Sequence, residues 1–250
     1  MRYLVAISLF SVISLLNTST LAQSTRDDLL RQIQKNRSEL QELEDQFLAP
    51  SEEDFASYAE FLRQPNTGLI RLLPREVYDD FTVRPGAKKS LTVRGGGAYY
   101  SFTKKTHEYG YGSDIELAQN YLSVGFAGLD YGMLLKLDDL PLDKLTSEDP
   151  ILSSLASYKI PTDEREVRSE QQRFGEGVMV NGALYKSRLP LELNTTYALR
   201  SINYSETDAL VAMRTVRKDT DGSVIIAWKL LQEFPKPELT RRKLAVASPR

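Results

Sequence analysis

The chain has 250 residues, of which 41% are apolar and 26% are charged, and its formal net charge is −2 at pH 7. This length suits one large domain or one domain with appendages, and the composition is ordinary for a globular protein. A net charge so close to zero, without any nucleic-acid-binding motif, excludes nucleic acid as an expected partner. The sequence contains no cysteine, which excludes disulfides, thiol nucleophiles and thiolate metal sites.

Residues 1–22 have the layout of a secretory signal peptide. Arg2 gives a positive start, residues 3–16 form an apolar run, and residues 20–22 (Thr-Leu-Ala) offer a small-x-small cleavage site. The apolar run is short for a membrane span, which needs about 20 residues. We therefore expect export to the periplasm or the extracellular space, with membrane attachment only if the signal peptide stays uncleaved.

Two helices are expected in the helical segment 23–66. Within residues 25–48, the seam positions recur at the 4-3-4-3-4 spacing of a coiled coil, and they are Leu29, Ile33, Asn36, Leu40, Leu43 and Phe47. This spacing leaves two alternatives open, namely packing on the rest of the chain or a homo-oligomer through residues 25–48. Pro50 ends this helix, and Ser51 with Asp54 three residues later can cap a second one.

Residues 67–234 are expected to form a mainly antiparallel β domain, as a sandwich or a partly closed barrel, so the predicted fold class is α+β. Strands are predicted at residues 69–73, 91–94, 98–104, 115–118, 121–126, 131–137, 177–185, 188–193, 196–203, 209–217 and 224–231. Short turn-rich connectors make the last three strands a meander, and residues 127–130 read as a hairpin turn. Residues 224–228 are apolar on both faces, which predicts cover on both sides of the sheet.

A small helical insertion is expected at residues 147–174, with two alternatives: a helical layer over the sheet, favoured by the apolar Ile151, Leu152 and Leu155, or a mobile flap. Ser147 is expected to cap a short helix through residue 158, and Pro161 to open a charged second helix. The tail at 235–250, which begins with two prolines, is expected to be disordered.

The most unusual stretch is residues 91–138, which holds eight of the chain's 14 glycines and its only histidine. Glycine lets the backbone approach a neighbour closely, and aromatic rings supply contact area. The Gly95-Gly96-Gly97 run lacks the spacing of a phosphate-binding loop, so it predicts a bend between strands. We expect the ligand-binding side chains in this stretch to be Arg94, Tyr99, His107, Glu108, Tyr109, Tyr111, Asp114 and Glu116.

The chemistry open to these residues is limited. His107 has no second histidine at metalloprotease spacing and the chain has no cysteine, so no metal is expected, and no cofactor is expected either. The chain also has no GxSxG nucleophile motif, which disfavours a Ser-His-Asp triad. The predicted function is therefore an exported, periplasmic, non-catalytic binding or scaffolding protein of the cell envelope. Its partner would be an envelope glycan, peptide or protein. The alternatives are a purely structural role for the stretch, or a hydrolase acting on a glycan or peptide through carboxylates near His107.

Overall fold

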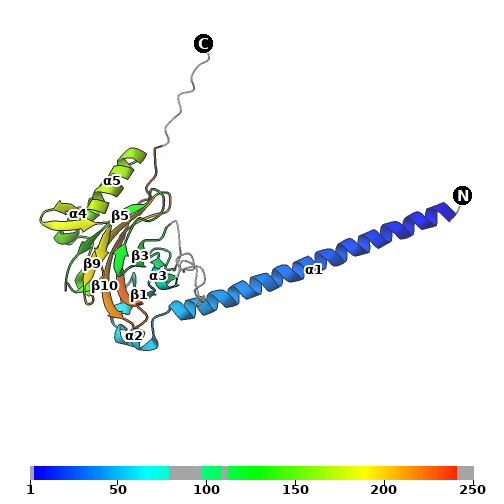
Figure 1. Ribbon diagram of the computed structural model, residues 1–250, viewed down its shortest axis with the longest axis horizontal. Coiled ribbons are helices and arrows are strands. Elements are labelled where there is room, and N and C mark those ends of the chain that lie inside the picture. Colours follow the sequence, from blue (N-terminus) through cyan, green and yellow to red (C-terminus); the bar gives the residue numbers. More distant parts are fainter. Residues whose placement is uncertain (1–2, 79–96, 108–111, 241–250) are drawn as a thin grey trace, which may run out of the picture. The chain divides into compact units, whose positions relative to one another are not determined.

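The computed structural model describes residues 3–78, 97–107 and 112–240, with the helical backbone alone for residues 3–24. The chain divides into two compact units, residues 1–47 and 48–250. The first unit is the helix α1 (Tyr3–Leu48), which contains the helix expected at 25–48 (Figure 1). Within the described part of the chain, no helix combines the length and the apolar character that a membrane crossing requires.

The second unit begins with the short helix α2 (Glu52–Ser57), which has the expected cap. The Ser51 hydroxyl accepts a hydrogen bond from the Asp54 amide at 3.2 Å, and the Asp54 carboxylate accepts one from the Ser51 amide at 3.0 Å. This reciprocal arrangement satisfies donors that the first turn of a helix leaves unpaired. A 3₁₀ turn, η1 (Phe61–Arg63), then leads into the first strand.

Seven antiparallel strands form the larger sheet, in the order β1-β11-β10-β9-β5-β7-β6. Their bounds are β1 (Thr67–Leu72), β5 (Tyr131–Lys136), β6 (Val178–Val180), β7 (Ala183–Lys186), β9 (Thr196–Asn203), β10 (Thr207–Lys218) and β11 (Val224–Glu233). Consecutive strands β9, β10 and β11 pair as the predicted meander, and β1 pairs with β11 at its edge.

A second, four-stranded antiparallel sheet has the order β2-β3-β4-β8. Its strands are β2 (Tyr99–Tyr100), β3 (Ile115–Ala118), β4 (Tyr121–Ser123) and β8 (Arg188–Pro190). The two sheets share a hydrophobic core and neither closes on itself, so the α+β prediction is confirmed in its sandwich form.

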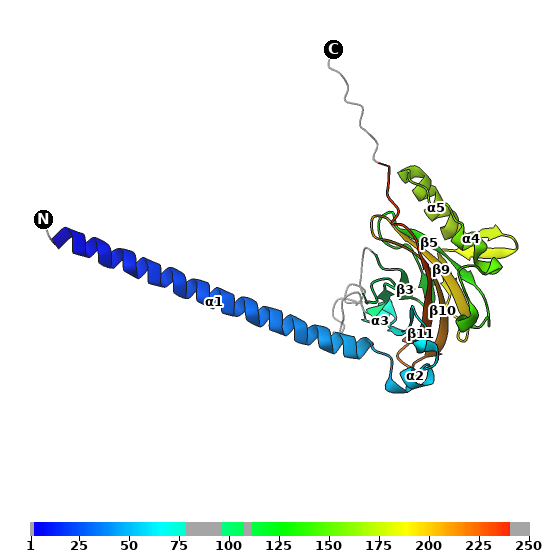
Figure 2. The same ribbon diagram turned by 180° about the vertical axis from the view of Figure 1, so that it is seen from behind.

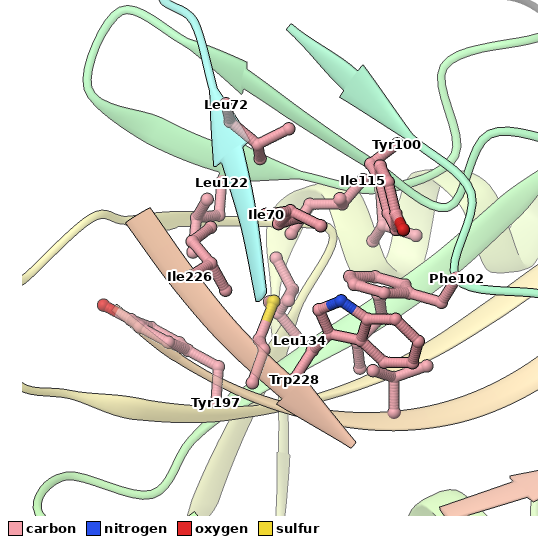
Figure 3. Close-up of a cluster of buried hydrophobic side chains, with 14 of the residues drawn as sticks. Ile70, Leu72, Tyr100, Phe102, Ile115, Leu122, Leu134, Tyr197, Ile226 and Trp228 are labelled. Carbon is pink, nitrogen blue, oxygen red and sulfur yellow. The ribbon is translucent and has the colours of Figure 1, made fainter. Parts of the chain in front are cut away.

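The core between the sheets is filled by alternate side chains of the strands. Ile226 and Trp228 of β11 meet Ile115 of β3 and Leu122 of β4 in the same cluster (Figure 3). The Trp228 ring also fixes its neighbour in β1, because a Cβ on Gly68 would lie 2.4 Å from that ring. Only glycine fits at this position without displacing the tryptophan.

Helices cover the opposite face of the larger sheet, as Figures 1 and 2 both show. They are η3 (Leu142–Lys144), η4 (Pro150–Leu152), α4 (Ser153–Ala156) and α5 (Glu164–Glu176), and their apolar side chains join those of the sheet in a second core cluster. The larger sheet is thus buried on both faces at β11, which confirms the cover predicted for residues 224–228, whereas Met179 of β6 and Leu184 of β7 are exposed.

A buried ion pair joins this helical layer to the sheet. Arg200 of β9 donates two hydrogen bonds to Asp208 of β10, at 2.5 and 2.8 Å, and a third to the Leu155 carbonyl of α4 at 3.1 Å. Both charged side chains are at most 2% exposed. Arg200 and Asp208 therefore compensate each other's buried charge.

Several local predictions were wrong. Residues 177–185 form two strands, β6 and β7, because Asn181 and Gly182 adopt the positive φ angles (51° and 82°) of a two-residue hairpin turn. Residues 127–130 do form a turn, but it links β4 and β5, which lie in different sheets, so it is not a hairpin.

The helical insertion also differs in detail from its prediction. Asp149, not Ser147, precedes the first turn of η4, and the helix α5 starts at Glu164 behind an Asp163 cap. The short helix α3 (Arg75–Tyr78) was not predicted at all. The predicted strand at residues 91–94 lies outside the described residues.

Candidate functional site

The eight side chains predicted to bind a ligand divide into two groups of four. Arg94, Glu108, Tyr109 and Tyr111 lie outside the residues that the structure describes. Tyr99, His107, Asp114 and Glu116 are described, and the structure places them as follows.

Asp114 lies just before β3 and is fully buried. Its carboxylate accepts hydrogen bonds from the Phe102 amide at 2.7 Å and from the Asn203 side chain of β9 at 3.0 Å. Burial raises the pKa of this carboxyl, and the hydrogen bonds that it accepts act in the opposite direction. Asp114 thus links the two sheets of the sandwich.

His107 is half-buried and bonds to the backbone of β1. Its Nε2–H donates a hydrogen bond to the Arg71 carbonyl at 2.8 Å, and its ring packs edge-on against Tyr100 with the centroids 5.0 Å apart. A carbonyl oxygen can only accept, so Nε2 carries the proton in this arrangement. Asp114 and His107 are therefore bonded to different strands of the larger sheet.

Glu116 and Tyr99 lie in one polar row on the outer face of the smaller sheet. The strand register places Tyr99 opposite Glu116, Glu116 opposite Ser123, and Ser123 opposite Arg188. Neighbouring residues of these strands, such as Leu122, point into the core between the sheets. Because side chains alternate along a strand, the polar row faces away from that core.

Two hydrogen bonds fix the carboxylate at the centre of this row. Glu116 Oε1 accepts one from the Tyr99 hydroxyl at 2.9 Å and one from Arg75 of α3 at 2.8 Å. The Glu116 side chain is only 7% exposed, whereas that of Arg75 is 38% exposed. The short helix α3 thus brings a guanidinium group to the edge of the row.

Arg188 stands at the other end of the row. Its guanidinium lies 4.1 Å from the centroid of the Tyr121 ring, and it donates a hydrogen bond to the Gln119 side chain at 3.1 Å. The backbone N–H of Gln119 in turn donates a hydrogen bond to the Glu76 carboxylate of α3 at 3.0 Å. Stacking on an aromatic ring restricts the guanidinium and leaves N–H groups at its edge that can bind a planar anion.

Several of these residues line a half-open pocket of about 310 Å³, which we call the row pocket; its lining is Arg75, Glu76, Glu116, Ala118, Gln119, Ser123 and Arg188. Its size lies at the lower end of the range for small-molecule sites. Two guanidinium groups and two carboxylates line it, so its formal charges cancel. Such a lining offers both N–H donors and carboxylate acceptors to a small polar ligand.

The sequence interpretation found Glu116 and Tyr99 but missed Arg75, Gln119 and Arg188. Arg188 could not be found because it is distant in sequence from Glu116. The two residues come into one row only through the pairing of both strands with β4, and the sequence does not show that register. Among the described residues, no group of three acidic or histidine side chains could hold a metal ion.

Comparison of the chain with protein-family models, with curated proteins and with solved structures gives no match. The fold and the row pocket must therefore carry the functional argument on their own physical chemistry.

Proposed function

We propose that the protein is exported to the periplasm or the cell exterior and acts there as a non-catalytic binding protein of the cell envelope. The binding site is the row pocket, and the ligand is a glycan or peptide group that bears a carboxylate. The signal-peptide layout of residues 1–22 supports the export step.

The observation that carries this proposal is the pair of guanidinium groups around a fixed carboxylate. Arg188 donates one hydrogen bond to Gln119, while a guanidinium has five N–H donors, so it can also receive a ligand carboxylate. Glu116 is held by two donors and offers its second oxygen to a ligand hydroxyl or amide N–H. Ser123, opposite both residues in the register, adds a hydroxyl.

Binding is favoured over hydrolysis by the way the carboxylates are used. Glycoside hydrolysis needs two carboxyl groups on opposite sides of one bond. Glu116 is bonded to α3 and β2, whereas Asp114 is fully buried and bonded to β9. These two acids of the predicted set therefore serve different contacts, and Glu76, the other carboxylate of the row pocket, accepts a hydrogen bond from the Gln119 backbone.

The proposal is tested by calorimetric titration with two related sugars, N-acetylmuramic acid and N-acetylglucosamine, which differ by a lactyl group that carries a carboxylate. We expect the acidic sugar to bind and the neutral one to bind at least about tenfold more weakly, because the carboxylate forms charge-assisted hydrogen bonds. A short acidic peptide is tested in the same way.

Arg188→Gln is the informative variant, and Arg168→Gln on the exposed face of α5 is its matched control. The first should abolish the preference for the acidic sugar, while the second should leave it unchanged. If neither the acidic sugar nor the acidic peptide binds, or if both variants behave alike, the row pocket is not the site that we propose.

A further inference from the structure

The helix α1 carries an apolar stripe that has no partner within its own unit. Leu29, Ile33, Leu40 and Leu43 are 46–62% exposed, and the described part of this unit, residues 3–47, has no second element on which they could pack. An isolated helix is marginally stable in water, and most helical stability comes from burial of an apolar face. The apolar stripe therefore needs a second surface that buries it from water.

The polar side of the same helix is, by contrast, satisfied along its own length. Arg31 bonds to Asp28 at 3.2 Å, and Gln41 bonds to Asp45 at 2.9 Å, both within one turn of the helix. Such contacts between residues three and four apart support a face that stays in water. The apolar face to be covered is thus the seam together with Leu30, which lies beside it and is 53% exposed.

We infer that residues 25–47 pair with the same segment of a second copy of this chain, as a parallel, in-register, two-stranded coiled coil. The argument for this occupant is Asn36, which interrupts the apolar stripe. A buried amide without a partner is destabilising, and an in-register parallel pair places the Asn36 amide of one helix opposite that of the other.

The antiparallel arrangement does not satisfy this amide. The spacing assigns Ile33 and Leu40 to one set of seam positions and Asn36 to the other. Antiparallel helices pack one set against the other, so Asn36 would lie against an isoleucine or a leucine of the second copy. The pairing of Asn36 with Asn36 thus favours a second copy of this chain as the partner and a parallel orientation of the two helices.

The positions that flank the seam add one unfavourable contact, since Glu39 would approach Glu44 of the second copy. Salt screens exposed like charges, so the association should tighten as the salt concentration rises. This inference is independent of the row pocket, and either can fail without the other.

The first test is sedimentation equilibrium of the untruncated protein from about 1 to 100 µM, a range that covers micromolar association. We expect the mass of two chains at the upper end. Leu40→Asp should weaken association by more than about tenfold, because it buries a charge in the seam. Ser38→Asp, on the opposite side of the helix, should leave it unchanged. A single-chain mass at all concentrations, equal behaviour of both variants, or weaker association in salt would overturn the inference.

The second test uses the absence of cysteine from the chain. A disulfide requires Cβ atoms about 3.5–4.5 Å apart, which only a parallel in-register pair provides at equal seam positions. Asn36→Cys should therefore form a covalent dimer under mild oxidation, and Ser38→Cys should not. Equal cross-linking of both variants, or none at residue 36, would refute the parallel register even if the protein is dimeric.

Discussion

A buried carboxyl in the turn before β5 should contribute to the pH dependence of stability. Asp130 Oδ1 accepts a hydrogen bond from the Tyr204 amide at 3.0 Å, and Oδ2 is buried without a hydrogen-bond partner among the described residues. Burial raises the pKa of Asp130 to about 6, the Tyr204 amide opposes this shift, and the charges of Glu206 and Asp114 add to it.

A carboxyl whose pKa is raised on folding stabilises the folded state fully only below its unfolded pKa. That contribution is lost as the pH rises from about 4 through about 6, and a shift from 3.8 to about 6 corresponds to about 3 kcal/mol. Asp130→Asn keeps an oxygen for the Tyr204 amide and removes the charge. We expect the variant to match the wild type near pH 4 and to exceed it by up to about 3 kcal/mol above pH 7.

The measurement is urea denaturation of both proteins across this pH range, followed by Trp228 fluorescence. Asp143→Asn, which changes an exposed aspartate, is the control and should leave the wild-type profile unchanged. A stability difference between Asp130→Asn and the wild type that is the same at all pH values would refute the argument, since it would show that the charge of Asp130 carries no cost.

Three further substitutions probe the packing of the β-rich unit. Asp208→Asn leaves the Arg200 charge buried and uncompensated, so urea denaturation should show a loss of about 3–5 kcal/mol; a loss below about 1 kcal/mol would contradict the buried pair. Gly68→Ala should lower the melting temperature and shift the emission of Trp228, the only tryptophan, because the new methyl group meets its ring. Gly182→Ala has open space around it but a φ of 82°, so it should cost only about 1 kcal/mol, and a loss as large as that of Gly68→Ala would be inconsistent with strain alone.

The architecture could be predicted from the sequence wherever periodicity and turn chemistry agree. The meander of β9, β10 and β11 follows from long apolar strands joined by short turns, and the Ser51 capping box follows from two residues at fixed spacing. The Asn181-Gly182 turn could also have been predicted from its two residues. Without it, β6 and β7 were predicted as one strand at residues 177–185.

The distribution of strands between the two sheets could not be predicted. β7 and β8 are separated by a single residue, Ser187, yet they belong to different sheets, and no local preference specifies such a change. The row pocket depends on this pairing, because Arg188 reaches the Glu116 row only through β4. Glu116 could be predicted as a site residue because its acidic side chain lies among aromatic residues in the sequence. Arg75 could not, because only the folded structure brings it to Glu116.

The pairing of β1 with β11 has a consequence for the order of assembly. The first strand of the larger sheet is synthesised early, and the strand that borders it is synthesised last. A nascent chain on the ribosome, or one threading through a translocation channel, therefore leaves β1 as an unpaired edge until residues 224–229 have emerged. Such edges recruit other strands, so the protein should depend on a holding chaperone during biogenesis and should not tolerate C-terminal truncation into β11.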